Sequence, residues 1–385
     1  MPPIAAHDIT PFTTPVDADE LDDLRTRLEG TRWARGELVD DWSQGVRLDV
    51  IRSLCEYWVD GYDWPTRAAL LDRHTQFRTT IGGLGIHFVH VRSSQPEALP
   101  LVMTHGWPGS IVEFQAVIGP LTDPVAHGGD AADAFHLICP SLPGYGWSDA
   151  PIERGMGPEE IAAIWAELMS RLGYDRYGAQ GGDWGSMVTA ALGTHHSDHV
   201  AGIHLNMPVV IPNSEPETPA ERQIADDLKR FRSVDSGYQK LQSTRPQTLG
   251  YGLVDSPVAQ AAWIVEKLWS WSDRAWSGED GGLGACFTDD EILDNVMLYW
   301  LPGAGVTSAR LYWENRQRPV LPIPTVPVGC SVFPKELART SRRWADAHYP
   351  DLRYFNEVDR GGHFAAWEQP ELFVDEVRAC FATMR

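Results

Sequence analysis

The spacing of apolar residues predicts helices near the start of the chain. Over 19–28 and over 49–59, apolar residues recur three or four positions apart, as they do on one face of a helix. Trp33, Trp42 and Trp64 are expected to anchor this first segment on a core, because large aromatic side chains bury much surface. The segment contains no arrangement of residues that suggests catalysis, so we expect it to be structural.

From residue 76 the pattern changes to that of strands. Short apolar or alternating runs are separated by turns and by helical patterns. The predicted strands are 76–81, 86–91, 99–104, 135–140, 177–180, 200–206, 326–331 and 354–358. Helices are predicted over 157–172, from 186 onward and over 370–381. Because strands alternate with helices, we expect an α/β fold with a mostly parallel sheet of eight strands and right-handed crossovers.

A change of composition around 208–219, to proline, asparagine, serine and glutamate, predicts an exit from this core. The following helical stretch is rich in aromatic residues and precedes the seventh strand. Such an insertion would form a lid over the carboxyl edge of the sheet, where open α/β sheets bind ligands. We therefore predict an N-terminal segment that wraps the core (1–75), a first core part (76–210), a helical lid (211–318) and a second core part (319–385).

Charge and cysteine content exclude several classes of protein. The chain of 385 residues has 32 Lys and Arg against 53 Asp and Glu, a formal net charge of −21. That charge repels phosphate backbones and anionic membranes, so nucleic-acid and membrane partners are disfavoured. Five scattered cysteines without a C-x-x-C pair are typical of a reducing cytoplasm and argue against a zinc site. The first eight residues lack a signal-peptide pattern, so we expect a cytoplasmic location.

The stretch 181–185, Gly-Gly-Asp-Trp-Gly, lies between a predicted strand and a predicted helix. Hydrolases of the α/β type place a nucleophilic serine at such a turn, in G-x-S-x-G, and this chain has no G-x-S-x-G. The central residue here is Asp183, whose carboxylate could attack carbon and form an ester. Capping of the following helix is the structural alternative for the same aspartate.

Two later residues could complete a catalytic triad with Asp183. His363 follows the last predicted strand, where this chain order supplies the base. Glu336 follows the seventh strand and could hold the His363 ring in the right tautomer. Asp359 and Glu357 are nearer to His363 in the sequence and compete for that role.

The loop 105–110, His-Gly-Trp-Pro-Gly-Ser, follows the third predicted strand. A loop in that place can direct the backbone N–H of Trp107 toward an oxyanion, with the N–H of Trp184 as the second donor. The bond between Trp107 and Pro108 is a candidate for the cis form, as in other tight X-Pro turns.

Together these stretches resemble the epoxide hydrolases of the microsomal type. The matching motifs are residues 105–110, 143–148 (Pro-Gly-Tyr-Gly-Trp-Ser), 181–185, 235–238 (Asp-Ser-Gly-Tyr), 333–336 (Phe-Pro-Lys-Glu) and 361–364 (Gly-Gly-His-Phe). The resemblance implies that Asp183 is the nucleophile, His363 the base and Glu336 its partner. It further implies that Tyr238 and Tyr312 of the lid bind the epoxide oxygen.

The activity implied is hydrolysis of a small-molecule epoxide to a vicinal diol through an ester on Asp183, without metal or organic cofactor. The aromatic lid suggests an apolar, aromatic substrate, with Trp107, Trp147, Trp184 and Trp313 as pocket candidates. Mammalian members of the family carry an N-terminal membrane anchor. This sequence lacks one and is similar to soluble bacterial members, some of which serve natural-product pathways such as enediyne antibiotic biosynthesis.

Two alternatives use the same residues differently. A haloalkane or haloacid dehalogenase would also use Asp183, His363 and an acid, but needs halide-binding N–H donors instead of the phenols of Tyr238 and Tyr312. A non-catalytic binding protein of the same fold would be expected to have lost a triad member, and none is missing. Association into a homo-oligomer is left open by the sequence.

Overall fold

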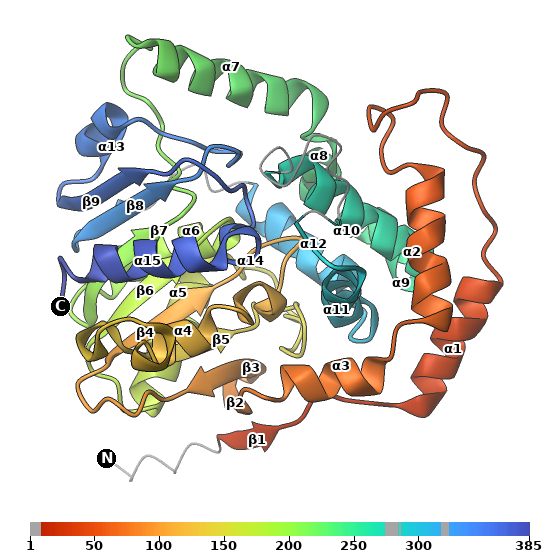
Figure 1. Ribbon diagram of the computed structural model, residues 1–385, viewed down its shortest axis with the longest axis horizontal. Coiled ribbons are helices and arrows are strands. Elements are labelled where there is room, and N and C mark those ends of the chain that lie inside the picture. The colour runs from red at the N-terminus through yellow and green to blue at the C-terminus, as the bar shows by residue number, and fades with distance from the viewer. Residues whose placement is uncertain (1–8, 274–283, 285, 317–322) are drawn as a thin grey trace.

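A nine-stranded sheet runs through the part of the chain that the computed structural model describes, residues 9–273, 284, 286–316 and 323–385 (Figure 1). Its strands are β1 (Thr10–Phe12), β2 (Gln76–Ile81), β3 (Leu84–Val91), β4 (Leu99–Thr104), β5 (Phe135–Pro140), β6 (Tyr177–Gly181), β7 (Val200–Leu205), β8 (Val328–Val332) and β9 (Leu352–Glu357). Their order across the sheet is β1-β2-β3-β5-β4-β6-β7-β8-β9.

The eight expected strands are present, and the mostly parallel α/β sheet is confirmed. Pairs from β5 to β9 are parallel, whereas β1, β2, β3 and β5 pair antiparallel. The ninth strand, β1, was not expected, because its three residues are too few to show a period. It pairs with β2 and extends the antiparallel edge.

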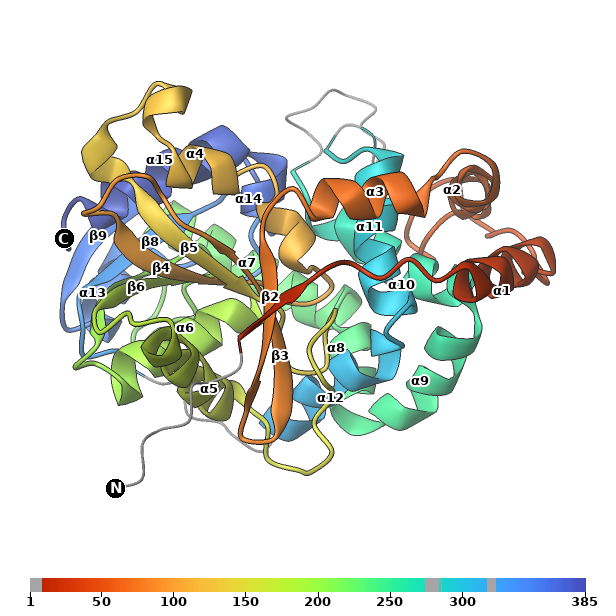
Figure 2. The same cartoon turned by 90° about the horizontal axis from the view of Figure 1, so that it is seen from below.

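Helices cover both faces of the sheet, which explains the unbroken apolar runs of its central strands. In Figure 2, α4 (Ile118–Thr122) and α15 (Pro370–Phe381) lie on one face. The other face is covered by α5 (Pro158–Arg171) and α6 (Trp184–His195). Every residue of β6 and β7 is buried, as expected of parallel strands between two helical layers.

The predicted lid is a set of helices between β7 and β8. These are α7 (Pro219–Val234), α8 (Gly237–Thr244), α9 (Pro246–Asp255), α10 (Pro257–Trp271), α11 (Asp289–Trp300) and α12 (Ala304–Asn315). Three of them begin with proline, whose fixed φ and missing N–H suit the first helical position.

Two predictions fall outside the described residues. One is the lid boundary at 318/319, and the other is the signal-peptide prediction, which used the first eight residues.

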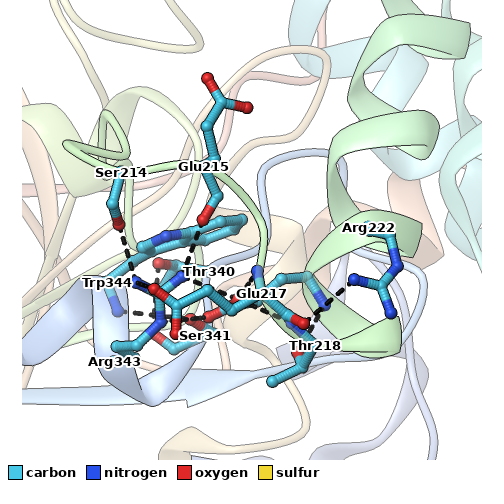
Figure 3. A network of polar contacts seen from close by, with 10 residues as sticks. Ser214, Glu215, Glu217, Thr218, Arg222, Thr340, Ser341, Arg343 and Trp344 are labelled. Atoms are coloured by element: carbon cyan, nitrogen blue, oxygen red, sulfur yellow. Dashed lines mark hydrogen bonds and ion pairs between the residues drawn. The ribbon is translucent and has the colours of Figure 1, made fainter.

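A buried carboxylate attaches the first lid helix to the core. Glu221, in the first turn of α7, accepts hydrogen bonds from the Arg343 Nε at 2.9 Å and the Ser341 hydroxyl at 2.7 Å. Figure 3 shows Arg343 among the polar side chains that precede α7, where its Nη1 donates to the Ser214 hydroxyl at 2.7 Å. The Arg343 guanidinium holds the pKa of Glu221 below its ordinary value. This network fixes the base of the lid beside α13 (Arg342–His348).

The N-terminal helices lie against the lid, and only β1 of this segment joins the sheet. Helices α1 (Ala18–Glu29), α2 (Leu48–Asp60) and α3 (Trp64–Leu71) contact α10 or α11 (Figure 1). The expected anchor Trp42 stacks on Trp269 of the lid, with ring centroids 4.4 Å apart. From the sequence we expected this segment to pack on the α/β core. In the structure, α2 packs against the lid helices α10 and α11 instead.

A buried ion pair joins this N-terminal segment to the lid. Arg67 of α3 donates to Asp294 of α11 through Nη2 at 2.6 Å and to Asp290 through Nη1 at 3.2 Å. The Tyr62 hydroxyl donates to Asp294 at 2.8 Å. Burial raises the pKa of Asp294, and the bonds from Arg67 oppose that effect.

Arg67→Met is expected to lower the free energy of unfolding by about 3 kcal/mol, because it leaves the Asp294 charge buried with one remaining donor. Chemical unfolding followed by circular dichroism measures the change. The matched control is Arg342→Met, which removes a largely exposed ion pair with Asp346 and should change the same quantity by less than about 1 kcal/mol. Equal losses in the two variants would contradict a buried structural role for Arg67.

Candidate active site

Asp183 stands on a strained turn between β6 and α6. Its φ of 49° is the one positive value at a non-glycine residue in the described part of the chain. Such strain costs about 1–3 kcal/mol and is typical of functional positions. The turn is tight enough that a Cβ at Gly185 would lie 1.9 Å from the Thr104 carbonyl oxygen. Asp183 occupies the N-cap position of α6, but its side chain makes no capping hydrogen bond.

The Asp183 carboxylate faces backbone donors and an imidazole instead. Its Oδ1 accepts a hydrogen bond from the Trp107 N–H at 2.8 Å. Its Oδ2 lies 3.7 Å from Nε2 of His363. Burial raises the pKa of Asp183, while His363 and the N–H groups of Trp107 and Trp184 lower it. The two expected oxyanion donors therefore both act on this carboxylate. The bond between Trp107 and Pro108, a candidate for the cis form in the sequence, is cis.

Glu336, rather than its sequence competitors, holds the His363 ring. Nδ1 of His363 donates to Oε1 of Glu336 at 2.8 Å, and both side chains are buried. The bond at Nδ1 turns Nε2 toward Asp183. Asp359 is exposed and pairs with Arg360, and Glu357 is exposed on β9.

The carboxylates around His363 keep its ring protonated in the resting protein. Burial by itself would lower the pKa of His363, but the charges of Glu336 and Asp183 raise it to about 9. Loss of the Asp183 charge removes one of these effects. Any reaction that neutralises Asp183 therefore lowers the pKa of His363 and favours the neutral ring, which is the form that can take a proton from water.

Tyr238 of α8 and Tyr312 of α12 meet above the Trp107 ring. Tyr238 stacks on Trp107 at 4.9 Å, and Tyr312 approaches its edge at 5.9 Å. Burial raises the pKa of both phenols well above the ordinary value, with the Asp183 charge adding to the effect, so both hydroxyls keep their protons. The Tyr312 hydroxyl makes no well-aligned hydrogen bond to any described residue.

A charged cluster inside the lid fixes the Tyr238 ring. Asp235 accepts from Lys267 Nζ at 2.5 Å and from the Trp271 indole at 2.7 Å. Lys267 Nζ in turn lies 5.0 Å from the centroid of Tyr238. The Trp271 carbonyl accepts the backbone N–H of His363 at 3.0 Å, so the cluster also links the lid to the histidine loop.

Two of the four predicted pocket tryptophans lie elsewhere. Trp147 packs against Phe12 of β1, with ring centroids 6.1 Å apart. The tight turn at 144–146 instead directs Tyr145 inward, where its hydroxyl donates to the Ser308 carbonyl at 3.1 Å. Trp313 follows Tyr312 on α12, 100° further round the helix, and it lines neither the cavity beside Asp183 nor the cavity that leads to Tyr312.

Three contributors to the site were missed in the sequence: Trp271, Tyr145 and Glu113. Trp271 is one of many lid aromatics, and no pattern distinguishes it. Tyr145 lies within the motif 143–148, of which only Trp147 was predicted to line the pocket. Glu113 could have been found, because it is a lone charge within the apolar stretch 111–114 directly after the Trp107 loop.

Two cavities lie at the site, one lined by residues of the triad and one by the neighbouring Trp184 and Tyr312. An open cavity of about 310 Å³ leads to Trp184 and Tyr312. Its outer walls carry polar and basic residues of α8 and of the end of α12, namely Ser236, Gln239, Lys240, Ser243, Asn315 and Arg316. A second cavity of about 20 Å³ lies beside Asp183 and His363 and is also lined by Glu113 and Asn206.

The described residues contain no group of three or more His, Cys, Asp or Glu side chains placed to hold a metal ion. Among the same residues, no helix has the length and apolar character needed to cross a membrane.

Comparisons with known proteins identify relatives of this chain. Residues 9–114 match the family model described as epoxide hydrolase N terminus, and residues 100–242 match that of the alpha/beta hydrolase fold. A provisionally named epoxide hydrolase of Stigmatella aurantiaca is 51% identical, over 98% of this chain and 86% of its own. Epoxide hydrolase 1 of Sus scrofa is 37% identical, over 98% and 89%. The crystal structure of juvenile hormone epoxide hydrolase from Bombyx mori superposes with a TM-score of 0.90 at 32% identity, covering 98% of this chain and 95% of that one.

Proposed function

Because this chain belongs to the epoxide hydrolase family of the α/β-hydrolase fold, we propose that it opens epoxides in two steps through an ester on Asp183. In the first step an Asp183 carboxylate oxygen attacks a ring carbon and breaks the bond between that carbon and the epoxide oxygen. The observation that carries the proposal is the unbroken line of contacts from Glu336 through His363 to Asp183.

Tyr238 and Tyr312 are the proposed acids of this step. The oxygen released from the ring is a poor leaving group as an alkoxide, and a neutral phenol can donate a proton to it. Both hydroxyls belong to the lid and lie over Trp107, beside the nucleophile. The Asp235–Lys267 pair holds Tyr238 in that place.

Once Asp183 is esterified, His363 releases its proton to solvent, and it regains one at the end of the cycle. In the second step water attacks the ester carbonyl of Asp183, and the neutral Nε2 of His363 takes one water proton. The tetrahedral oxyanion would accept from the N–H groups of Trp107 and Trp184, each worth about 2.7–4 kcal/mol in comparable enzymes. Collapse breaks the bond between Asp183 and the glycol oxygen, which takes the proton from His363. The second water proton stays on Asp183 and returns to the phenol that protonated the ring oxygen.

The proposed substrate is an apolar, aromatic epoxide. Aromatic rings of Trp107, Trp184, Tyr238 and Tyr312 surround the nucleophile, and apolar walls of this kind favour apolar ligands. Service in a natural-product pathway, enediyne antibiotic biosynthesis included, and a cytoplasmic location remain predictions from the sequence. The dehalogenase alternative is disfavoured by the lid phenols and by the named relatives, which are epoxide hydrolases.

A single turnover of styrene oxide in ¹⁸O-water, with enzyme in excess, tests the ester route. The first diol should carry no ¹⁸O at the attacked carbon, because its oxygen comes from Asp183. Mass spectrometry of the peptide with Asp183 should then show the label. A labelled diol in the first turnover would mean direct attack by water and would overturn the proposal.

Tyr238→Phe and Tyr312→Phe are each expected to slow ester formation about 100-fold, because each removes one proton donor from the ring oxygen. Ester hydrolysis should change little. Stopped-flow tryptophan fluorescence with styrene oxide separates the two rates. The matched control is Tyr251→Phe on the exposed side of α9, which should leave both rates unchanged. Normal ring opening in both active-site variants would remove these phenols from the mechanism.

A further inference from the structure

Glu113 carries a carboxyl group beside the triad. It lies on the short turn η1 (Ile111–Phe114), among buried apolar residues that follow the Trp107 loop. No described residue hydrogen-bonds or pairs with its carboxyl group, which faces the small cavity next to His363 and Asp183. A Cβ at Gly109 would lie 1.5 Å from Oε1 of Glu113, so a glycine leaves the room that this carboxyl group occupies.

The small cavity has the size and lining of a water site. Its volume of about 20 Å³ exceeds the roughly 10–15 Å³ that one water molecule needs. Asp183, His363, Asn206 and Glu113 contribute polar groups to its wall, and the rest is largely apolar, with Phe364 and Phe373 among the lining residues. A buried water usually makes about three hydrogen bonds, and this wall supplies them.

We propose that Glu113 binds, in this cavity, the water that attacks the ester. The inference rests on the proposed two-step function and assigns a residue to its second step. Water would donate one proton to Nε2 of His363 and hydrogen-bond through the other to a Glu113 oxygen. Glu113 neither gains nor loses a proton in the step, so the proton balance given above is unchanged.

The protonation of Glu113 agrees with this role. Burial raises the pKa of Glu113 to about 8, against the lowering effect of His363. At neutral pH the group is therefore mainly a carboxylic acid. Its carbonyl oxygen accepts a hydrogen bond without adding another negative charge beside the developing oxyanion.

The test follows the two half-reactions of styrene oxide in the full-length enzyme. Glu113→Met removes the acceptor and should slow ester hydrolysis about 100-fold, the size of loss expected from a misplaced reactant. Ester formation should stay within about twofold of wild type. The ester then accumulates, which quenching and intact mass detect, and KM falls together with kcat.

Matched variants separate water binding from packing. Glu113→Gln keeps a carbonyl acceptor and should restore most of the hydrolysis rate. Gln115→Met makes the same exchange of a polar side chain for methionine two residues along, outside the cavity wall, and should change neither rate. If Glu113→Met does not fold, Gly109→Ala serves instead, because its methyl group displaces the carboxyl group and should reproduce the selective loss.

Ester hydrolysis at the wild-type rate in Glu113→Met, or in Gly109→Ala where that variant replaces it, would overturn the inference, as would an equal loss in both half-reactions. Failure of the underlying function looks different. In that case no ester would be trapped in any variant, and the first diol of the wild type would carry ¹⁸O.

Discussion

Asp183→Asn is expected to abolish diol formation from styrene oxide, with a loss of roughly 10⁴-fold or more, while the protein stays folded. The amide lacks the negative charge that attacks the ring carbon, and no other nucleophile stands on the turn. Burial raises the pKa of Asp183, which means that its charge is held at a cost to the folded state. A neutral side chain of the same shape should therefore preserve or increase stability.

Circular dichroism, thermal unfolding and steady-state kinetics check this result together. Intact mass must also show that the amide persists, because water and His363 beside it could hydrolyse it back to the acid. Asp198→Asn is the matched control, since Asp198 is exposed near the far end of the same helix. Substantial turnover by a verified amide variant would remove Asp183 from the role of nucleophile.

His363→Gln is expected to stop the reaction at the ester. General bases contribute about 10²- to 10⁴-fold, so hydrolysis should slow by that factor. Ester formation needs no base, because Asp183 is already ionised, and it should stay within about tenfold of wild type. Rapid quenching followed by intact mass would show one equivalent of covalently bound substrate.

The pH dependence of the wild type provides a second view of the same histidine. Ester hydrolysis requires neutral His363, so its rate should rise with pH. The midpoint should lie below the pKa of about 9 in the resting protein, because esterification removes the negative charge of Asp183. The matched control for His363→Gln is His195→Gln, which changes an exposed histidine at the end of α6. Equal loss of both half-reactions in His363→Gln would indicate a structural role instead.

The triad could be predicted from the sequence because its signals are local and ordered. Asp183 lies between glycines at a strand-to-helix turn, and His363 follows the last strand after Gly361-Gly362. Position after the seventh strand favoured Glu336 over the nearer Asp359, and the distance of 2.8 Å to His363 agrees. In a parallel sheet the carboxyl ends of strands share an edge, so chain order translates into proximity.

What the sequence left open depends on side-chain direction and on distant contacts. The turn at 144–146 directs Tyr145 inward and Trp147 outward. Because both residues are aromatic, residue type alone does not distinguish them. Glu113 gains its position from the space at Gly109, which no periodic pattern records. The contact of α3 with α11 joins residues that are 227 positions apart, through Arg67 and Asp294.

That long-range contact has a consequence for how the protein is made. The ribosome releases the N-terminal helices well before it has synthesised α10 and α11, against which they pack. During that interval the apolar side of α2, with Ile51, Leu54 and Trp58, has no lid helix to cover it. Exposed apolar surface of this kind promotes aggregation and is what chaperones bind. Slow translation through the lid would prolong this exposure, whereas β1 can already pair with β2 within the first hundred residues.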